Sequence, residues 1–309
     1  MPVTLRQLEI FERVAKCQHV TKASEQLLLT QSAVSMAIAE LEKFAGAPLF
    51  ERLGRSLLLN DRGRLILPEV HELLKGAGRI AQFMLESMTE PIGVLNVGAS
   101  TTIGNYLLPL IVGEFSRQYP RAKAKLYVGN TQQIEAAVTT GAYDLGLIEG
   151  PSHNSSLSSA PWRDDQLVVI AGTTHPWAQA RDASIAMLQT ASWIMREKGS
   201  GTREIFETVM EAKGIKYAVD MELGHTEAIK KAVEAGLGVG CLSRMAVQRE
   251  LDHGWLIEIN TPLDLQRTLT VVTRETGYKT TLMKSYLCLL ERNARCGSAC
   301  NADSQAPAG

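Results

Sequence analysis

The chain has 309 residues, enough for about two domains, and its composition, 45% hydrophobic and 21% charged, is typical of a folded globular protein. Lysine plus arginine (32) and aspartate plus glutamate (33) give a net charge of −1, which excludes nucleic-acid binding driven by overall charge. The sequence shows no secretion signal and no run of about 18 apolar residues, so we expect a cytoplasmic protein without a membrane partner. Five cysteines, an odd number, predict no disulfide framework.

Two short helices are predicted at the start of the chain. Thr4 is a candidate N-cap, and the apolar residues that follow it recur at helical spacing: Leu5, Leu8, Phe11 and Ala15. Thr21 is then expected to cap a second helix over residues 22–28, with Ala23 and Leu27 facing inward. A tight turn at residues 29–30 separates this helix from the next one. Two helices with such a turn between them predict a helix-turn-helix.

The helix expected over residues 30–42 has an unusual surface. Val34, Ile38 and Leu41 form one apolar stripe, while short polar side chains occupy the leading face instead of the charged residues of an ordinary surface helix. Such groups can bind base edges and phosphates in a major groove. The predicted contacts to double-stranded DNA from this helix are Thr30, Gln31, Ser32, Ser35 and Met36.

A small hairpin is predicted after this helix. Residues 46–52 break the helix and begin an extended segment, and residues 55–59 return alongside it. Arg52 and Arg55 lie where they could reach phosphates or the minor groove beside the helix. The alternative is that both are solvated hairpin charges. Next to a helix-turn-helix, contact with DNA is the better hypothesis.

Residues 1–63 resemble the winged helix-turn-helix of LysR-type transcriptional regulators. The motifs that carry the resemblance follow the family's order: the Leu-xx-Leu-xx-Phe first helix, Lys22-Ala23-Ser24-Glu25-Gln26-Leu27, Thr30-Gln31-Ser32-Ala33-Val34-Ser35, and Pro48-Leu49-Phe50-Glu51-Arg52. Met36 departs from the pattern, because many members carry Arg, Lys or Gln there. Met36 could instead contact a thymine methyl group.

A long helix is expected next, with Asn60-Asp61 as its cap. Its apolar positions step by four and three residues: Ile66, Val70, Leu73, Ala77, Ile80, Met84 and Met88. The seam could cover the chain's own second domain, but its length favours pairing between subunits. The family resemblance likewise implies a dimer through this helix, which would present two recognition helices to an interrupted dyad-symmetric site. Pro91 and Gly93 are expected to end the helix and form a hinge.

Alternating strands and helices after residue 93 predict a mostly parallel α/β sheet with a ligand crevice at the carboxyl ends of its strands. Three helices in this region begin with hydroxyl-bearing residues, near Ser100, near Thr202 and near Thr226. Hydroxyls at helix starts usually cap their own helices. Three of them in one region nevertheless favour a cleft for an oxyanion or carboxylate. His225 could contact such a ligand or face solvent.

Residues 92–293 resemble the effector-binding domain of the same family, which has the two-lobed fold of periplasmic solute-binding proteins (type 2). The carrying motifs include Leu107-Leu108-Pro109, Gly141-Ala142-Tyr143-Asp144-Leu145 and Ala235-Gly236-Leu237-Gly238. The resemblance implies lobe I at about 92–162 and 266–293 and lobe II at about 163–265. The predicted effector-binding residues are Ser100, Thr101, Thr102, Asn130, Glu149, Thr202, His225 and Thr226.

The segments 98–104 and 199–203 look most like the sulfur-assimilation branch of the family. They suggest a sulfite-like or sulfate-like oxyanion as the effector, with a small carboxylate as the alternative. Glu149 would repel either anion unless Arg203 or another cation balances its charge.

The sequence therefore predicts a ligand-responsive transcriptional regulator in four parts: a DNA-binding domain (1–60), a linker and dimerisation helix with a hinge (61–91), the effector-binding domain (92–293) and a flexible tail (294–309). No cofactor, metal or catalytic residue is expected, since no catalytic signature is present. A homodimer or homotetramer is expected, with RNA polymerase as a further candidate partner. The alternative is a small-molecule-binding protein or an enzyme of the two-lobed fold without a regulatory role.

Overall fold

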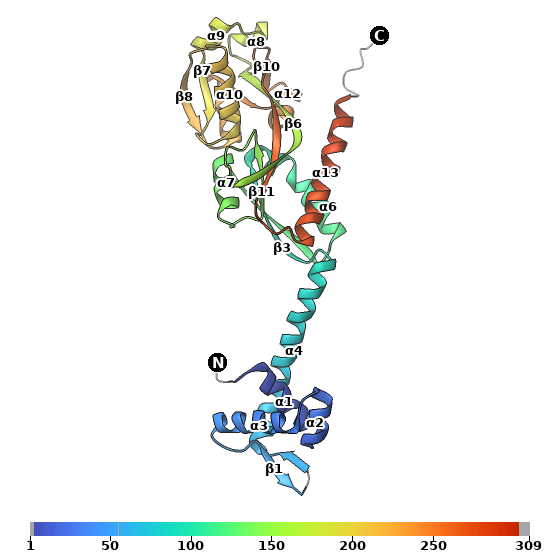
Figure 1. Cartoon of the computed structure of the whole chain (residues 1–309). Coiled ribbons are helices and arrows are strands. Elements are labelled where there is room, and N and C mark those ends of the chain that lie inside the picture. The colour runs from blue at the N-terminus through green and yellow to red at the C-terminus, as the bar shows by residue number, and fades with distance from the viewer. Residues whose placement is uncertain (1–2, 55, 303–309) are drawn as a thin grey trace. The chain divides into compact units, whose positions relative to one another are not determined.

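The computed structural model describes residues 3–54 and 56–302, with side chains described up to residue 294 (Figure 1). The chain forms two compact units, Met1–Glu86 and Ser87–Gly309. The architecture is a helix-turn-helix followed by a two-lobed α/β domain, as the sequence predicts. Among the described residues, no helix combines the length and the apolar character needed to cross a bilayer.

The first unit is a winged helix-turn-helix. It contains α1 (Leu5–Cys17), α2 (Val20–Leu27), α3 (Gln31–Ala45), the hairpin β1 (Phe50–Leu53) and β2 (Ser56–Leu59), and most of α4 (Asp61–Thr89). Thr4 and Gln7 form a reciprocal capping box at the start of α1. The three predicted stripe residues of α3 are buried in a core shared with α1, α2 and β1. The predicted helices, turn and wing are confirmed.

The start of α2 differs from the sequence prediction. The helix begins at Val20 with His19 as its N-cap, so Thr21 lies within the first turn and caps nothing. Its hydroxyl instead accepts a hydrogen bond of 2.7 Å from Gln31 Nε2 on α3. The chain leaves α2 through Leu28, whose φ of 54° lies in the left-handed region and produces the sharp turn toward α3.

Helix α4 begins as predicted, because Asn60 Oδ1 accepts a hydrogen bond from the Gly63 amide at 2.9 Å. Its predicted apolar seam has two different environments. Ile66 and Val70 pack into the core of the first unit. Leu73 and Ile80, by contrast, are 44% and 59% exposed. Leu73 and Ile80 are therefore accessible to a second helix, whereas Ile66 and Val70 are not.

Lobe I of the second unit is built on three parallel strands in the order β4-β3-β5. Its elements are β3 (Gly93–Ser100), α5 (Thr101–Tyr106), α6 (Leu108–Gln118), β4 (Ala122–Gly129), α7 (Thr131–Thr139), β5 (Leu145–Glu149), β11 (Gln266–Arg274) and α13 (Thr281–Ala302). Helices α6 and α13 share the main core of this lobe. Because α13 extends to Ala302, residues 294–302 are helical where a flexible tail was expected.

Lobe II repeats this plan with parallel strands in the order β8-β7-β9. Its elements are α8 (Trp177–Ala180), α9 (Ile185–Thr190), β7 (Ser192–Arg196), α10 (Gly201–Ala212), β8 (Ala218–Leu223), α11 (Thr226–Glu234), β9 (Val239–Ser243), α12 (Arg244–Asp252) and β10 (Leu256–Ile259). Separate apolar clusters cover the two faces of its sheet, with Trp193 and Phe206 in one of them and Ile229 and Val233 in the other.

The long strand β6 (Leu157–Gly172) joins the two lobes. Its first part pairs with β11 up to Gln166, and from Leu167 onward it pairs with β9. Both pairings are antiparallel, as are those of β11 with β5 and of β10 with β6, so the sheet is mixed, with three parallel strands in each lobe. The carboxyl ends of the parallel strands in both lobes therefore face the crossing point, which is where ligands bind in folds of this kind.

The exposed part of the α4 seam generates a test of self-association. Replacing Leu73 and Ile80 together by Glu places charge on the apolar stripe while leaving the part that packs into the first unit intact. Sedimentation velocity should show a shift toward smaller species at equal concentration. The variant Gln82→Glu, also on α4, should sediment as the wild type. An unchanged distribution for the double variant would show that this seam does not join subunits.

Candidate functional site

The leading surface of α3 presents the side chains predicted to contact DNA. Gln31, Ser32, Ser35 and Met36 are all exposed, and Met36 is 62% exposed. Thr30 has a structural task, because its hydroxyl accepts a hydrogen bond from the Ala33 amide and so caps the helix. The Gln31 amide is held toward α2 by its bond to Thr21. The helix therefore offers a polar face whose first side chain is already oriented.

Of the two wing arginines, the structure describes one. Arg52 lies on β1 and is exposed, paired in register with Leu57 of β2. Arg55 lies outside the described residues. The described part of the wing thus has one cation that can reach DNA phosphates.

In the second unit, hydrogen bonds bring the ends of several strands together. Thr101 Oγ1 donates to the Gly129 carbonyl at 3.3 Å, which joins the ends of β3 and β4. Several bonds cross between the lobes; in two of them the Gln132 amide donates to the Gly199 carbonyl at 3.1 Å, and Arg196 Nη2 donates to Thr101 Oγ1 at 3.2 Å. The predicted residues near 100, 130 and 200 therefore lie close together where the lobes meet.

A buried ion-pair network lies at this junction between the lobes, and it is called the Arg267 floor below. Arg267 Nη1 donates to Glu149 Oε2 at 2.7 Å, and Arg267 Nε donates to Asp165 Oδ2 at 2.7 Å. The side chains of these three residues are at most 3% exposed. The network joins β5, β6 and β11 at the point where the chain crosses between lobes. Asp165 also accepts a hydrogen bond from the Ser243 hydroxyl of lobe II at 2.8 Å.

The predicted site residue Glu149 is committed to this network. Burial alone would raise the pKa of its carboxyl group, but Arg267 and the hydrogen bonds from Thr202 Oγ1 and the Thr102 amide lower that pKa to about 2. The cation that balances Glu149 is therefore Arg267. Arg203, which the sequence suggested, instead binds Glu207 and Glu222.

Several other predicted effector residues also have intramolecular partners. The Thr202 hydroxyl donates to Glu149 and accepts a hydrogen bond from Arg267 at 3.0 Å. Asn130 Oδ1 caps α7 by accepting from the Gln133 amide. His225 is the exposed N-cap residue of α11, without a capping bond from its side chain. Gly201 permits this packing, since a Cβ there would lie 2.0 Å from the Glu149 carbonyl oxygen.

Three buried hydroxyls at helix starts have no hydrogen-bond partner within the described chain: Ser100 Oγ, Thr131 Oγ1 and Thr226 Oγ1. They come from both lobes, and each follows the end of a parallel strand. The ordinary explanation, that such hydroxyls cap their own helices, does not apply to Ser100, whose side chain makes no capping bond. Buried polar groups are almost always hydrogen-bonded, so three unpartnered hydroxyls at helix starts are unusual.

The residue best suited to bind an anion was missed from the sequence. Arg196, at the end of β7, is 1% exposed. Its Nε and Nη2 atoms donate to the two carboxylate oxygens of Glu197 at 2.8 and 2.9 Å. Its charge also contributes to lowering the pKa of Glu149. The only sequence signal was its position directly before the Gly/Ser/Thr-rich turn, since nothing in the pattern distinguishes a buried arginine from an exposed one.

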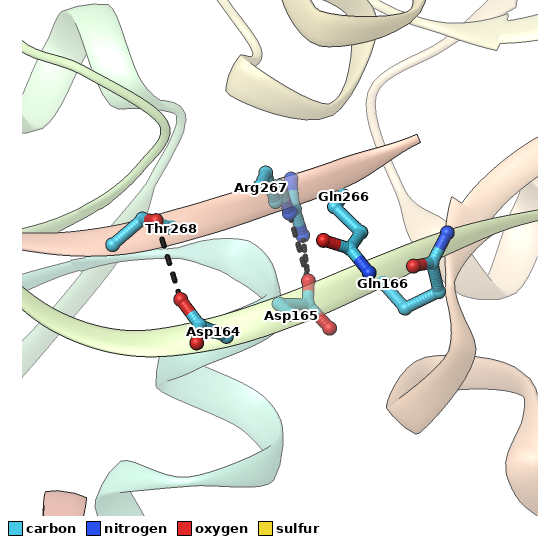
Figure 2. A pocket seen from close by; sticks show the side chains of 6 residues that line it. All are labelled: Asp164, Asp165, Gln166, Gln266, Arg267 and Thr268. Atoms are coloured by element: carbon cyan, nitrogen blue, oxygen red, sulfur yellow. Dashed lines mark hydrogen bonds and ion pairs between the residues drawn. The ribbon is translucent and has the colours of Figure 1, made fainter. Parts of the chain in front are cut away.

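A pocket of about 480 Å³ lies against the strands that connect the lobes (Figure 2). Its lining comes from paired positions of β6 and β11: Asp164, Asp165, Gln166, Gln266, Arg267 and Thr268. Figure 2 shows the Asp164–Thr268 bond and the Arg267–Asp165 pair between the two strands. In the part of the chain that the structure describes, no group of three or more His, Cys, Asp or Glu side chains is placed to hold a metal ion.

Two protein-family models match the chain. Residues 5–64 match the bacterial regulatory helix-turn-helix protein model of the lysR family, and residues 89–295 match the LysR substrate binding domain. The chain belongs to the LysR family of transcriptional regulators. It therefore combines a DNA-binding helix-turn-helix with an effector-binding domain.

Relatives of this LysR-type regulator support the assignment along nearly its whole length. The uncharacterized HTH-type transcriptional regulator YeiE of Escherichia coli (strain K12) is 41% identical over 288 residues, covering 93% of this chain and 97% of its own. CysL of Bacillus subtilis (strain 168), the relative that bears on the sulfur-assimilation branch, is more distant at 28% identity over 296 residues, with 93% and 96% covered. These comparisons thus show the family, and the sulfur-assimilation branch stays a prediction.

Solved structures show the same fold. The oxidized form of Corynebacterium glutamicum OxyR aligns with 100% of this regulator and 97% of its own chain, with a TM-score of 0.73 and 22% identity. The regulatory domain of Synechocystis PCC6803 CcmR, in complex with 2-PG, aligns with 66% of this regulator and 98% of its own chain, with a TM-score of 0.61 and 30% identity. The second structure shows that a related domain binds a small molecule.

The low pKa of Glu149 generates a test of the network. A carboxyl group whose pKa falls from 4.5 to about 2 on folding contributes about 3 kcal/mol above pH 4.5, and this contribution is lost as the pH falls toward 2. Urea denaturation should therefore show a wild-type advantage over Glu149→Gln that is full at pH 7 and smaller at pH 3. Glu211→Gln, at an exposed position of α10, is the control. An advantage independent of pH would contradict the network.

Proposed function

We propose that this regulator reads an interrupted dyad DNA site with Gln31, Ser32 and Ser35 and responds to a small anion bound between the lobes of its effector domain. The DNA contacts are supported by the exposed polar face of α3. The anion site is supported above all by one observation: the buried hydroxyls of Ser100 and Thr226, from opposite lobes, have no partner within the described chain.

The ligand-contacting residues that we propose differ from the sequence-based set, because two residues are removed and two are added. Ser100, Thr101, Thr102, Asn130, His225 and Thr226 remain candidates. Glu149 and Thr202 are removed from the contacting set and support it from beneath, because Arg267 already binds both side chains. Thr131 and Arg196 join the set, since one has an unsatisfied buried hydroxyl and the other supplies a buried positive charge.

The chemistry of these groups favours an oxyanion or a small carboxylate. Hydroxyls donate single hydrogen bonds, and a guanidinium donates two in parallel to paired oxygens. Sulfite-like and sulfate-like anions meet this requirement, in line with the resemblance to the sulfur-assimilation branch, and so do small carboxylates. That the related CcmR domain was solved with 2-PG supports a small-molecule effector in this fold.

In this proposal, binding shifts the equilibrium between arrangements of the two lobes. Because the ligand would contact both lobes, it favours the arrangement in which both sets of groups reach it. In a homodimer or homotetramer such a shift changes the spacing of the recognition helices and the bend of the DNA. The protein would act in the cytoplasm, where RNA polymerase is a further partner.

The DNA-reading role of α3 is tested by Ser35→Glu. A carboxylate at this exposed position would repel phosphates and block base contacts, while the buried stripe of α3 is untouched. The affinity for the DNA duplex that the wild type binds most tightly should fall at least about tenfold, because each good base contact contributes about 1–3 kcal/mol. Electrophoretic mobility shifts measure this, with thermal unfolding as the check on folding. Unchanged specific affinity would remove α3 from the interface.

The anion site is tested by Ser100→Ala and Thr131→Val. Neither change breaks an intramolecular hydrogen bond of the side chain in question, so the stability of the free protein should stay nearly constant. The stabilisation by a bound anion should fall by about 1 kcal/mol per lost bond. Thermal-shift titrations with sulfite, sulfate, acetate and oxalate measure both quantities. If an anion stabilises the wild type and both variants equally, the site lies elsewhere.

A further inference from the structure

The Arg196–Glu197 pair has an unusual local geometry. Consecutive residues of a strand point to opposite faces, so neighbours in sequence rarely form a bidentate pair. Here Arg196 is the last residue of β7, and Glu197 opens the turn that leads to α10. The turn is tightened by Gly199, with a φ of 85°, and by a bond from the Ser200 amide to the Glu197 carbonyl. This turn lets both side chains lie on the same side.

The two partners differ in burial. The Arg196 side chain is 2% exposed, whereas the Glu197 side chain is 23% exposed. Arg196 has further contacts that hold it in place: Nη2 donates to Thr101 of lobe I, and Arg203 Nη1 donates to the Arg196 carbonyl. Its guanidinium is therefore a fixed group. The Glu197 carboxylate has a path to solvent and could leave without unfolding the turn.

The carboxylate also lies close to the segment that leads into α11. One of its oxygens lies 4.0 Å from the position that a Cβ would take on Gly224, two residues before the start of α11. Thr226, with its unsatisfied hydroxyl, is the first residue of that helix. Thus two carboxylate oxygens of the protein occupy the Arg196 guanidinium, close to the segment that carries Thr226.

We propose that Glu197 is an internal substitute for the effector: its carboxylate occupies Arg196 in the ligand-free protein and must be displaced when an anion binds. This inference rests on the anion site proposed above. The exchange conserves charge at Arg196, because one pair of anionic oxygens replaces another. The displaced carboxylate moves into solvent, where it is hydrated. The bond from Arg196 to Thr101 need not break.

Displacement would set the concentration at which the regulator responds. A site that is open only for a fraction of the time has its apparent affinity lowered by that fraction. If the pair is closed about nine-tenths of the time, the apparent dissociation constant is raised about tenfold. Glu197 would thereby keep the regulator unresponsive to low background levels of competing anions.

The test is Glu197→Gln in the full-length protein, which keeps the size of the side chain but removes its charge. Isothermal titrations with sulfite, sulfate, acetate and oxalate should give about tenfold tighter binding of the anion that binds best. Glu207→Gln is the matched control, because Glu207 lies nearby and binds Arg203 rather than the Arg196 side chain. It should change affinity by less than about twofold, which separates displacement from a general charge effect. Arg196→Gln should abolish binding.

The outcomes separate this inference from the proposed function. Unchanged or weaker anion affinity of Glu197→Gln, together with loss of binding in Arg196→Gln, would overturn the displacement and leave the anion site intact. Equal gains in Glu197→Gln and Glu207→Gln would also overturn it. Binding that survives in Arg196→Gln, or the absence of binding in the wild type and in Glu197→Gln alike, would overturn the anion site itself.

Discussion

The buried guanidinium of Arg267 is the interaction on which the effector domain depends. It lies where β6 and β11 cross between the lobes and binds carboxylates on both neighbouring strands, Glu149 and Asp165. Removing one partner from a buried pair leaves an uncompensated charge and typically costs 3–5 kcal/mol. The arrangement is therefore strongly fixed, and the carbonyl of Glu149 in turn abuts the start of α10 at Gly201. The cleft above it is built on this rigid floor.

This constraint separates the groups that stabilise the network from the groups that we propose to bind a ligand. Thr202 and the Thr102 amide complete the solvation of Glu149, so they stabilise the floor. The unsatisfied hydroxyls lie outside this network, and the second buried guanidinium, Arg196, is paired with Glu197. An anion that reaches both lobes acts on the connection between them, while α3 presents its polar face in a separate unit. The proposed DNA-reading surface and the proposed ligand site therefore lie in different units of the chain.

The sequence predicted the elements well, because helix periodicity, caps and turn residues are local signals. The sequence did not predict hydrogen bonds, ion pairs or burial that depend on residues distant in the chain. Thr21 resembled an N-cap, yet its hydroxyl binds Gln31 ten positions later. Glu149 and Arg267 are far apart in the chain, so no local pattern could show that they form a pair. Ile66 and Val70 continue the α4 seam in sequence but pack on the first unit, since burial depends on what lies opposite.

Hydrogen exchange of the full-length protein, followed by mass spectrometry, tests the central claim that one anion bridges both lobes above the Arg267 floor. The probe is whichever of sulfite, sulfate, acetate or oxalate stabilises the protein against heat. The account predicts slower exchange in residues 100–104 of lobe I and in residues 199–204 and 225–229 of lobe II together, with little change in the already buried strand β11. Slower exchange confined to one lobe, or to a region outside these segments, would contradict it.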